Sequence, residues 1–134
     1  MQLNEFQARI NVIARGIEVN SIDLVRQVAL VVDQTVVSST PVDTGRAKTN
    51  WITALNSPSR QQINIPDTSG GVAINQCTDT LRNVHSGDTV FISNNLPYIQ
   101  RLNDGWSRQA PAGFVEQAVQ SGANAVARFR GLIR

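Results

Sequence analysis

The sequence has little of the chemistry that most active sites need. It contains one cysteine, Cys77, and one histidine, His85, in 134 residues. A single cysteine excludes an internal disulfide and a cysteine metal cluster, and a single histidine excludes a histidine-pair metal site. The carboxylates are scattered singly, so the sequence indicates no paired-acid site for general acid–base catalysis. We therefore expect no catalytic residues, no metal and no cofactor.

Charged residues are also sparse, at 16% of the chain, and aromatic residues make up 5%. A soluble domain usually carries about a quarter charged residues, so part of the uncharged surface is expected to contact neighbouring chains. The net charge is +2 and Lys48 is the only lysine. Arginine, which supplies the other basic residues, pairs with carboxylates through a planar fork and suits interfaces.

Long apolar runs are absent as well. The longest run, Val28–Val32, is much shorter than the ~20 residues that span a bilayer. Met1–Glu5 lacks the basic start of a signal peptide, so we expect neither secretion nor a membrane partner. The length and the apolar content of 41% predict a single domain, 1–134, with one modest core.

Apolar residues recur at helical spacing near both ends of the chain. An N-terminal helical arm is predicted within 1–19, with its helix near Leu3–Arg15, and a second helix is predicted over Ser21–Ser38. The second helix is rich in β-branched residues, but about eighteen residues without a turn signal exceed the usual strand. Its expected core face consists of Val25, Val28, Val32 and Val36.

A last helix is predicted from Pro111–Gly113 to the chain end, because proline is tolerated in a first helical turn. Its main apolar stripe comprises Val115, Val119, Gly122, Val126, Phe129 and Ile133, widened by Phe114, Ala118 and Ala125.

Alternation of polar and apolar residues predicts strands at Lys48–Asn56 and Thr89–Ser93. Between them, 57–88 reads as a variable loop region, with a short strand at Ile63 and Ile65 and a short helix carrying Ile74, Cys77, Leu81 and Val84. The predicted fold class is α+β: a small antiparallel sheet packed against a long N-terminal helical segment and a C-terminal helix.

Two separated segments combine turn-forming residues with an arginine and aromatics. The first is Thr40–Arg46, in which Pro41 ends a helix and Asp43-Thr44-Gly45 forms a tight turn. Asp43 and Arg46 there predict a local ion pair or, alternatively, an arginine that reaches a neighbouring subunit. The second segment runs from Asn94-Asn95-Leu96-Pro97-Tyr98 to Gly105-Trp106-Ser107 and Ala110-Pro111-Ala112-Gly113. Trp51 is expected in the core, whereas Trp106 is expected either to anchor an interface or to pack on its own domain.

These segments, in this order and at this spacing, resemble the small tail-component or neck proteins of long-tailed bacteriophages, which act at the head–tail joint. The resemblance covers Ser21 to Arg130, and 57–88 shows no family pattern. It implies that the family-motif turns and assembly candidates are Pro41, Asp43, Thr44, Gly45, Arg46, Trp51, Asn94, Pro97, Tyr98, Gly105, Trp106, Ser107 and Pro111.

The resemblance further implies a non-enzymatic virion protein. Its expected role is that of a ring-forming homo-oligomeric subunit in neck or tail completion, needed for head–tail assembly. Its implied partners are connector or stopper, tail-terminator and tail-tube proteins, and DNA that passes without sequence readout. The implied location is the virion neck or tail, and the host cytoplasm during assembly.

Two other functions remain open from the residues alone. Cys77 and His85, eight residues apart, could pair as nucleophile and base in a small cytosolic thiol enzyme. Cys77, however, lies on an apolar stripe, where a free cysteine is usually inert core. A regulatory DNA-binding adaptor is the third interpretation, although no helix carries an obvious base-reading set.

Overall fold

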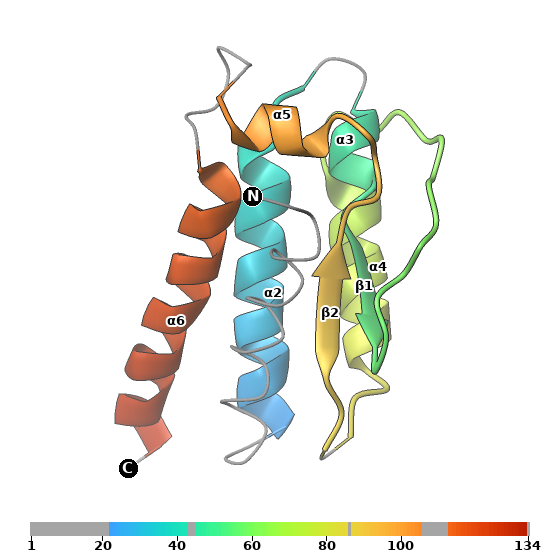
Figure 1. The fold of residues 1–134 in the computed structure, drawn as a ribbon. Coiled ribbons are helices and arrows are strands. Elements are labelled where there is room, and N and C mark those ends of the chain that lie inside the picture. The colour runs from blue at the N-terminus through green and yellow to red at the C-terminus, as the bar shows by residue number, and fades with distance from the viewer. Residues whose placement is uncertain (1–21, 43–44, 86, 106–112, 134) are drawn as a thin grey trace.

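The computed structural model describes residues 22–42, 45–85, 87–105 and 113–133. Its elements are α2 (Ile22–Ser39), α3 (Arg46–Thr49), β1 (Ile52–Leu55), α4 (Gly71–Leu81), β2 (Val90–Ser93), α5 (Ile99–Asn103) and α6 (Phe114–Ile133). The helices pack with one two-stranded antiparallel sheet at one side of the molecule (Figure 1), so the α+β class is confirmed at this level. The predicted arm, 1–19, lies outside the described residues.

Helix α2 is central to the packing. It contacts α6 on one side and α4 on the other, and α4 also packs against β1 (Figure 1). The predicted core face of α2 is confirmed, because Val25, Val28, Val32 and Val36 are each at most 3% exposed. The helix ends just before Pro41, which has no N–H to continue the hydrogen-bond ladder.

The predicted stripe of α6 is confirmed where its side chains are described: Val115 and Gly122 are buried and Val119 is half-buried. The side chains of Val126, Phe129 and Ile133 lie outside the described residues. Phe114, Val115, Ala118 and Ala125 are each at most 1% exposed, whereas Val119 is only half-buried. The residues predicted to widen the stripe, Phe114, Ala118 and Ala125, are thus as deeply buried as Val115. Small side chains at a helix contact allow the two axes to approach, which favours the alanines at this position.

Strand β1 is shorter than the predicted strand over Lys48–Asn56. It pairs with β2 in the register Ile52↔Ser93 to Leu55↔Val90. The first predicted strand residues belong instead to α3, because the N–H of Thr49 donates to the carbonyl of Gly45 at 3.1 Å. Local helical hydrogen bonds thus prevail over the alternating pattern.

The segment 57–88 is largely ordered by contacts with the rest of the fold. It contains α4, as the helical spacing predicted, and Ala73, Cys77 and Leu81 face the core. The predicted short strand at Ile63 and Ile65 is wrong, because these residues form a connection without strand pairing. Figure 1 shows this long green connection running from β1 back along the molecule to α4.

Candidate functional site

The first motif segment is fixed to the core through Trp51. The Thr40 hydroxyl donates to the carbonyl of Val36 at 2.6 Å and accepts the indole N–H of Trp51 at 2.8 Å. Trp51 is 1% exposed, so its predicted core position is confirmed. Pro41, the residue after Thr40, is also buried. Trp51 and Pro41 therefore stabilise the fold and are not exposed contact residues.

Gly45 provides the turn that starts α3. Its φ of +86° lies in the left-handed region, as the tight turn predicted. A Cβ atom here would lie 2.3 Å from the carbonyl carbon of Asp67, so two backbones meet at this point. Arg46 follows as the first residue of α3 and is half-buried. Asp43 and Thr44 lie outside the described residues, so the predicted Asp43–Arg46 pair stays a prediction.

Asn94 joins the second motif segment to α3, which begins at Arg46, the last residue of the first segment. Its amide nitrogen donates to the carbonyl of Ala47 in α3 at 3.0 Å, and its Oδ1 accepts the N–H of Leu96 at 3.1 Å. Asn94 is 1% exposed and Leu96 is fully buried. The structure thus brings two parts of the chain that lie 47 residues apart into one buried corner.

The remaining candidates of the second segment lie around α5. Pro97 is exposed, Tyr98 is half-buried at the start of α5, and Gly105 follows α5 with a φ of +90°. Trp106, Ser107 and Pro111 lie outside the described residues, so their predicted interface roles stay predictions.

Asn103, which sequence reasoning missed, connects α5 to the start of α6. Its Oδ1 accepts the N–H of Val115 at 2.9 Å, and its carbonyl accepts the N–H of Gly113 at 2.7 Å. Its amide nitrogen also donates to both carboxylate oxygens of Glu116, at 3.2 and 3.1 Å. The cap of α6 therefore comes from another helix, which local capping rules do not identify.

Two residues at the end of α3 hold the connection between β1 and α4. The Asn50 side chain accepts the N–H of Ile63 and donates to the Ile63 carbonyl, both at 2.7 Å. The Thr49 hydroxyl bonds with the carbonyl of Ile65 at 2.7 Å. An asparagine amide carries both an acceptor and a donor, so it can pair with a backbone as a strand neighbour would.

Residues in the second motif segment, and Ser93 just before it, hold the connection between β1 and α4 at a point nearer β1. The amide nitrogen of Asn95 donates to the carbonyls of Ser59 and Gln61, at 2.7 and 3.2 Å. The Ser93 hydroxyl also reaches the Ser59 carbonyl, at 3.3 Å, and Gln62 donates to the carbonyl of Asn95 at 3.0 Å. The end of α3 and the second motif segment, with Ser93 beside it, therefore fix 59–65 jointly. Neither Asn50 nor Asn95 was a predicted site residue.

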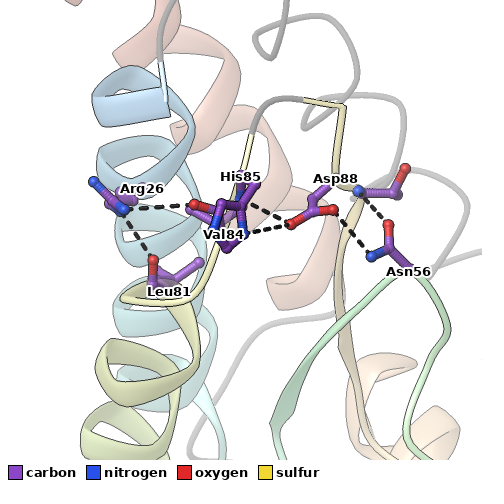
Figure 2. Close-up of polar contacts among 7 residues, drawn as sticks. Arg26, Asn56, Leu81, Val84, His85 and Asp88 are labelled. Carbon is purple, nitrogen blue, oxygen red and sulfur yellow. Dashed lines mark hydrogen bonds and ion pairs between the residues drawn. The ribbon is translucent and has the colours of Figure 1, made fainter.

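A second polar cluster lies at the C-terminal end of α4 (Figure 2). Arg26 from α2 donates to the carbonyls of Leu81 and Val84, at 2.9 and 3.5 Å. Arg26 also forms an ion pair with Asp23 at 3.2 Å. A cation is favourable at a helix C-terminus, where carbonyls lack helical partners. Arg26 thus fastens α4 to α2.

At the same end of the molecule, hydrogen bonds connect the turn after α4 to the sheet. Asp88 accepts the N–H of His85 at 2.8 Å and the amide of Asn56 at 3.1 Å (Figure 2). The hydrogen bond from the His85 N–H, together with that from Asn56, lowers the pKa of Asp88. Asn56 also accepts the N–H of Thr89 at 3.0 Å. These contacts close the strand pair.

The core contains one unexpected acid, Asp33 on α2, beside Cys77 of α4. Asp33 is 0% exposed, and neither carboxylate oxygen has a hydrogen-bond partner that meets ordinary geometry. Burial raises the pKa of Asp33 to about 8, and the nearby thiol only partly opposes this shift. Burial and the Asp33 charge also raise the pKa of the Cys77 thiol.

The predicted pairing of Cys77 with His85 has little geometric support. Cys77 is 0% exposed in the core, whereas the His85 side chain is 83% exposed and lies 3.8 Å from Asp88. A raised thiol pKa also opposes nucleophilic reactivity. An apolar groove of about 400 Å³ between α2 and α4 is lined by neither residue.

The described residues contain no group of three or more His, Cys, Asp or Glu side chains able to hold a metal ion. Within the same ranges, no helix is long and apolar enough to cross a membrane. Comparison of the chain with protein-family models, with curated proteins and with solved structures finds no match in any of the three.

Proposed function

We propose that this chain is a structural virion protein of a tailed bacteriophage, a ring-forming subunit of the neck or tail-completion region at the head–tail joint. The observation that supports the proposal most is the contact between Asn94 and Ala47, at 3.0 Å. It joins the second of the two segments on which the resemblance to tail-component proteins depends to α3, the helix that begins at the last residue of the first segment. The resemblance itself comes from sequence, and the geometry is compatible with it.

The arrangement suits a part that must keep its shape while neighbours bind to it. Three buried hydrogen bonds fix the chain: Asn94 donates to α3, Thr40 at the end of α2 accepts from Trp51, and Asn103 of α5 accepts from the start of α6. Buried polar contacts of this kind favour one geometry, because each unpaired group would cost about 1–3 kcal/mol. Rigid corners allow repeated head-to-tail contacts to close into a ring around passing DNA.

Light scattering of the purified protein, alone and mixed with purified tails, tests this role. We expect either a defined oligomer or a mass increase on the tails. A persistent monomer that ignores the tails would contradict the proposal.

The thiol-enzyme alternative predicts that Cys77→Ala abolishes biological activity. We expect activity to survive, with a stability loss of about 1 kcal/mol from the small cavity. Loss of activity without loss of folding would favour the enzyme instead.

A further inference from the structure

The connection between β1 and α4 is bonded along one edge only. Inward contacts fall on alternate residues: the carbonyls of Ser59, Gln61, Ile63 and Ile65 all bond with side chains at the end of α3 or in the second motif segment. A spacing of two residues is that of an extended strand, whose backbone groups alternate between its two edges. The segment 59–65 is thus held as a strand would be, with side chains in place of a neighbouring strand.

The opposite edge of this segment faces outward. The backbone N–H and C=O groups of Arg60, Gln62 and Asn64 have no hydrogen-bond partner in the described part of the chain. All three residues are exposed. Pro58 and Pro66 flank the segment, and proline lacks the N–H that a longer ladder would need. The open edge is therefore short and has defined ends.

We infer that the outer edge of 59–65 is a docking site for an extended strand of another protein chain. An unpaired row of backbone donors and acceptors is a template for strand addition. The inference rests on the proposed function for the source of that strand, a neighbouring virion protein.

The side chains around the edge indicate the chemistry of the partner strand. Arg60 is exposed and forms no ion pair within the described ranges, so it favours a carboxylate opposite it. Ile65 is 45% exposed and is one of two large apolar side chains so exposed among the described residues. The fitting partner therefore carries an acidic residue toward one end and an aliphatic residue toward the other.

A second copy of this chain fits the edge less well. Along β1, the side chain of Gln76 already bonds with the N–H and carbonyl of Thr53, at 2.9 and 2.7 Å. Along β2, Val90 and Ile92 are fully buried. The accessible extended segment in the described ranges is then 59–65 itself, and it carries no acidic residue that could face Arg60 of another copy, which favours a different protein as the partner.

A matched pair of variants at Asn64 tests the site. Asn64→Pro removes the outward N–H, whereas Asn64→Ala keeps it, and the exposed Asn64 side chain forms no hydrogen bond within the described ranges that either variant would lose. Each variant is supplied to a phage that lacks the wild-type protein, and infectious particles are counted. We expect Asn64→Ala to match wild type and Asn64→Pro to reduce the yield about tenfold, with an unchanged melting temperature.

Hydrogen exchange keeps the test decisive if the proline variant folds poorly. In the wild-type protein alone, the amides of Arg60 and Gln62 should exchange rapidly, while the Ile63 amide is protected. In assembled particles, Arg60 and Gln62 should also become protected.

Equal yields from the two variants, or unprotected amides in the particle, would overturn the inference and leave the proposed function intact. Self-association of the free protein that Asn64→Pro abolishes would overturn the choice of partner. Full infectivity without the protein would refute the proposed function itself.

Discussion

Substitution of Gly45 by alanine should destabilise the protein far more than the same substitution at Gly87. Both glycines have left-handed backbones, with φ values of +86° and +91°. A Cβ atom at Gly87 would meet nothing within 4 Å, whereas at Gly45 it would lie 2.3–2.5 Å from backbone atoms of Asp67 and Thr68. Gly87→Ala therefore measures the cost of the backbone conformation alone, and Gly45→Ala adds the displacement of a second backbone.

The left-handed conformation costs an alanine about 1 kcal/mol, and reduced freedom of the unfolded chain offsets part of this. Displacing the chain at Asp67 also disturbs its carboxylate, which accepts the N–H of Val72 at 2.8 Å and the hydroxyl of Ser69 at 2.6 Å. Each such hydrogen bond contributes about 1 kcal/mol. We expect Gly87→Ala to lose about 1 kcal/mol and Gly45→Ala about 3–4 kcal/mol.

Urea unfolding, followed by circular dichroism, measures both free energies of unfolding. Gly70→Ala serves as an intermediate case, because its Cβ would meet only side-chain atoms, the nearer being Cγ1 of Val37 at 2.6 Å. The expected loss in free energy of unfolding is smallest at Gly87, intermediate at Gly70 and largest at Gly45. Equal losses at Gly45 and Gly87 would refute the close packing of the first motif turn against the connection.

Two further predictions concern buried polar residues. Because folding raises the pKa of Asp33 from 3.8 to about 8, the folded state holds a proton that the unfolded state releases above pH 3.8. This group's contribution to stability is therefore intact below pH 3.8 and is lost as pH rises toward 8, at about 1.4 kcal/mol per pH unit. Urea unfolding at several pH values should show that Asp33→Asn removes this pH dependence of the free energy of unfolding. The same pH dependence in the variant and the wild type would show that the carboxyl is not protonated in the fold. Asn94→Ala should cost about 2–3 kcal/mol by leaving the Ala47 carbonyl and the Leu96 N–H unpaired; a loss below about 0.5 kcal/mol would mean that this contact does not join the second motif segment to α3.

The helices were predictable because their signals are local. The valine periodicity of α2 places its core face correctly, and Pro41 marks its end. The turn at Gly45 was also predictable, because glycine next to aspartate and threonine favours a positive φ. The alternating residues after it misled, since Lys48 and Thr49 complete a helical turn before β1 begins.

The role of the connection could not be predicted, because it depends on contacts between distant residues. The carbonyls of Ser59 and Ile63 bond with Asn95 and Asn50, and nothing in the local sequence marks these partners. Asparagine is common in turns for other reasons, so its two-sided pairing with a backbone has no distinct signature. The buried Asp33 was missed likewise, because a single acid in a valine-rich helix normally faces solvent.

Electron microscopy of lysates from a phage that lacks this protein tests the central claim most directly. If the chain completes the head–tail joint, the lysate should contain filled or emptied heads and separate tails, and added purified protein should restore joined particles. Complete, infectious virions in the absence of the protein would contradict the account.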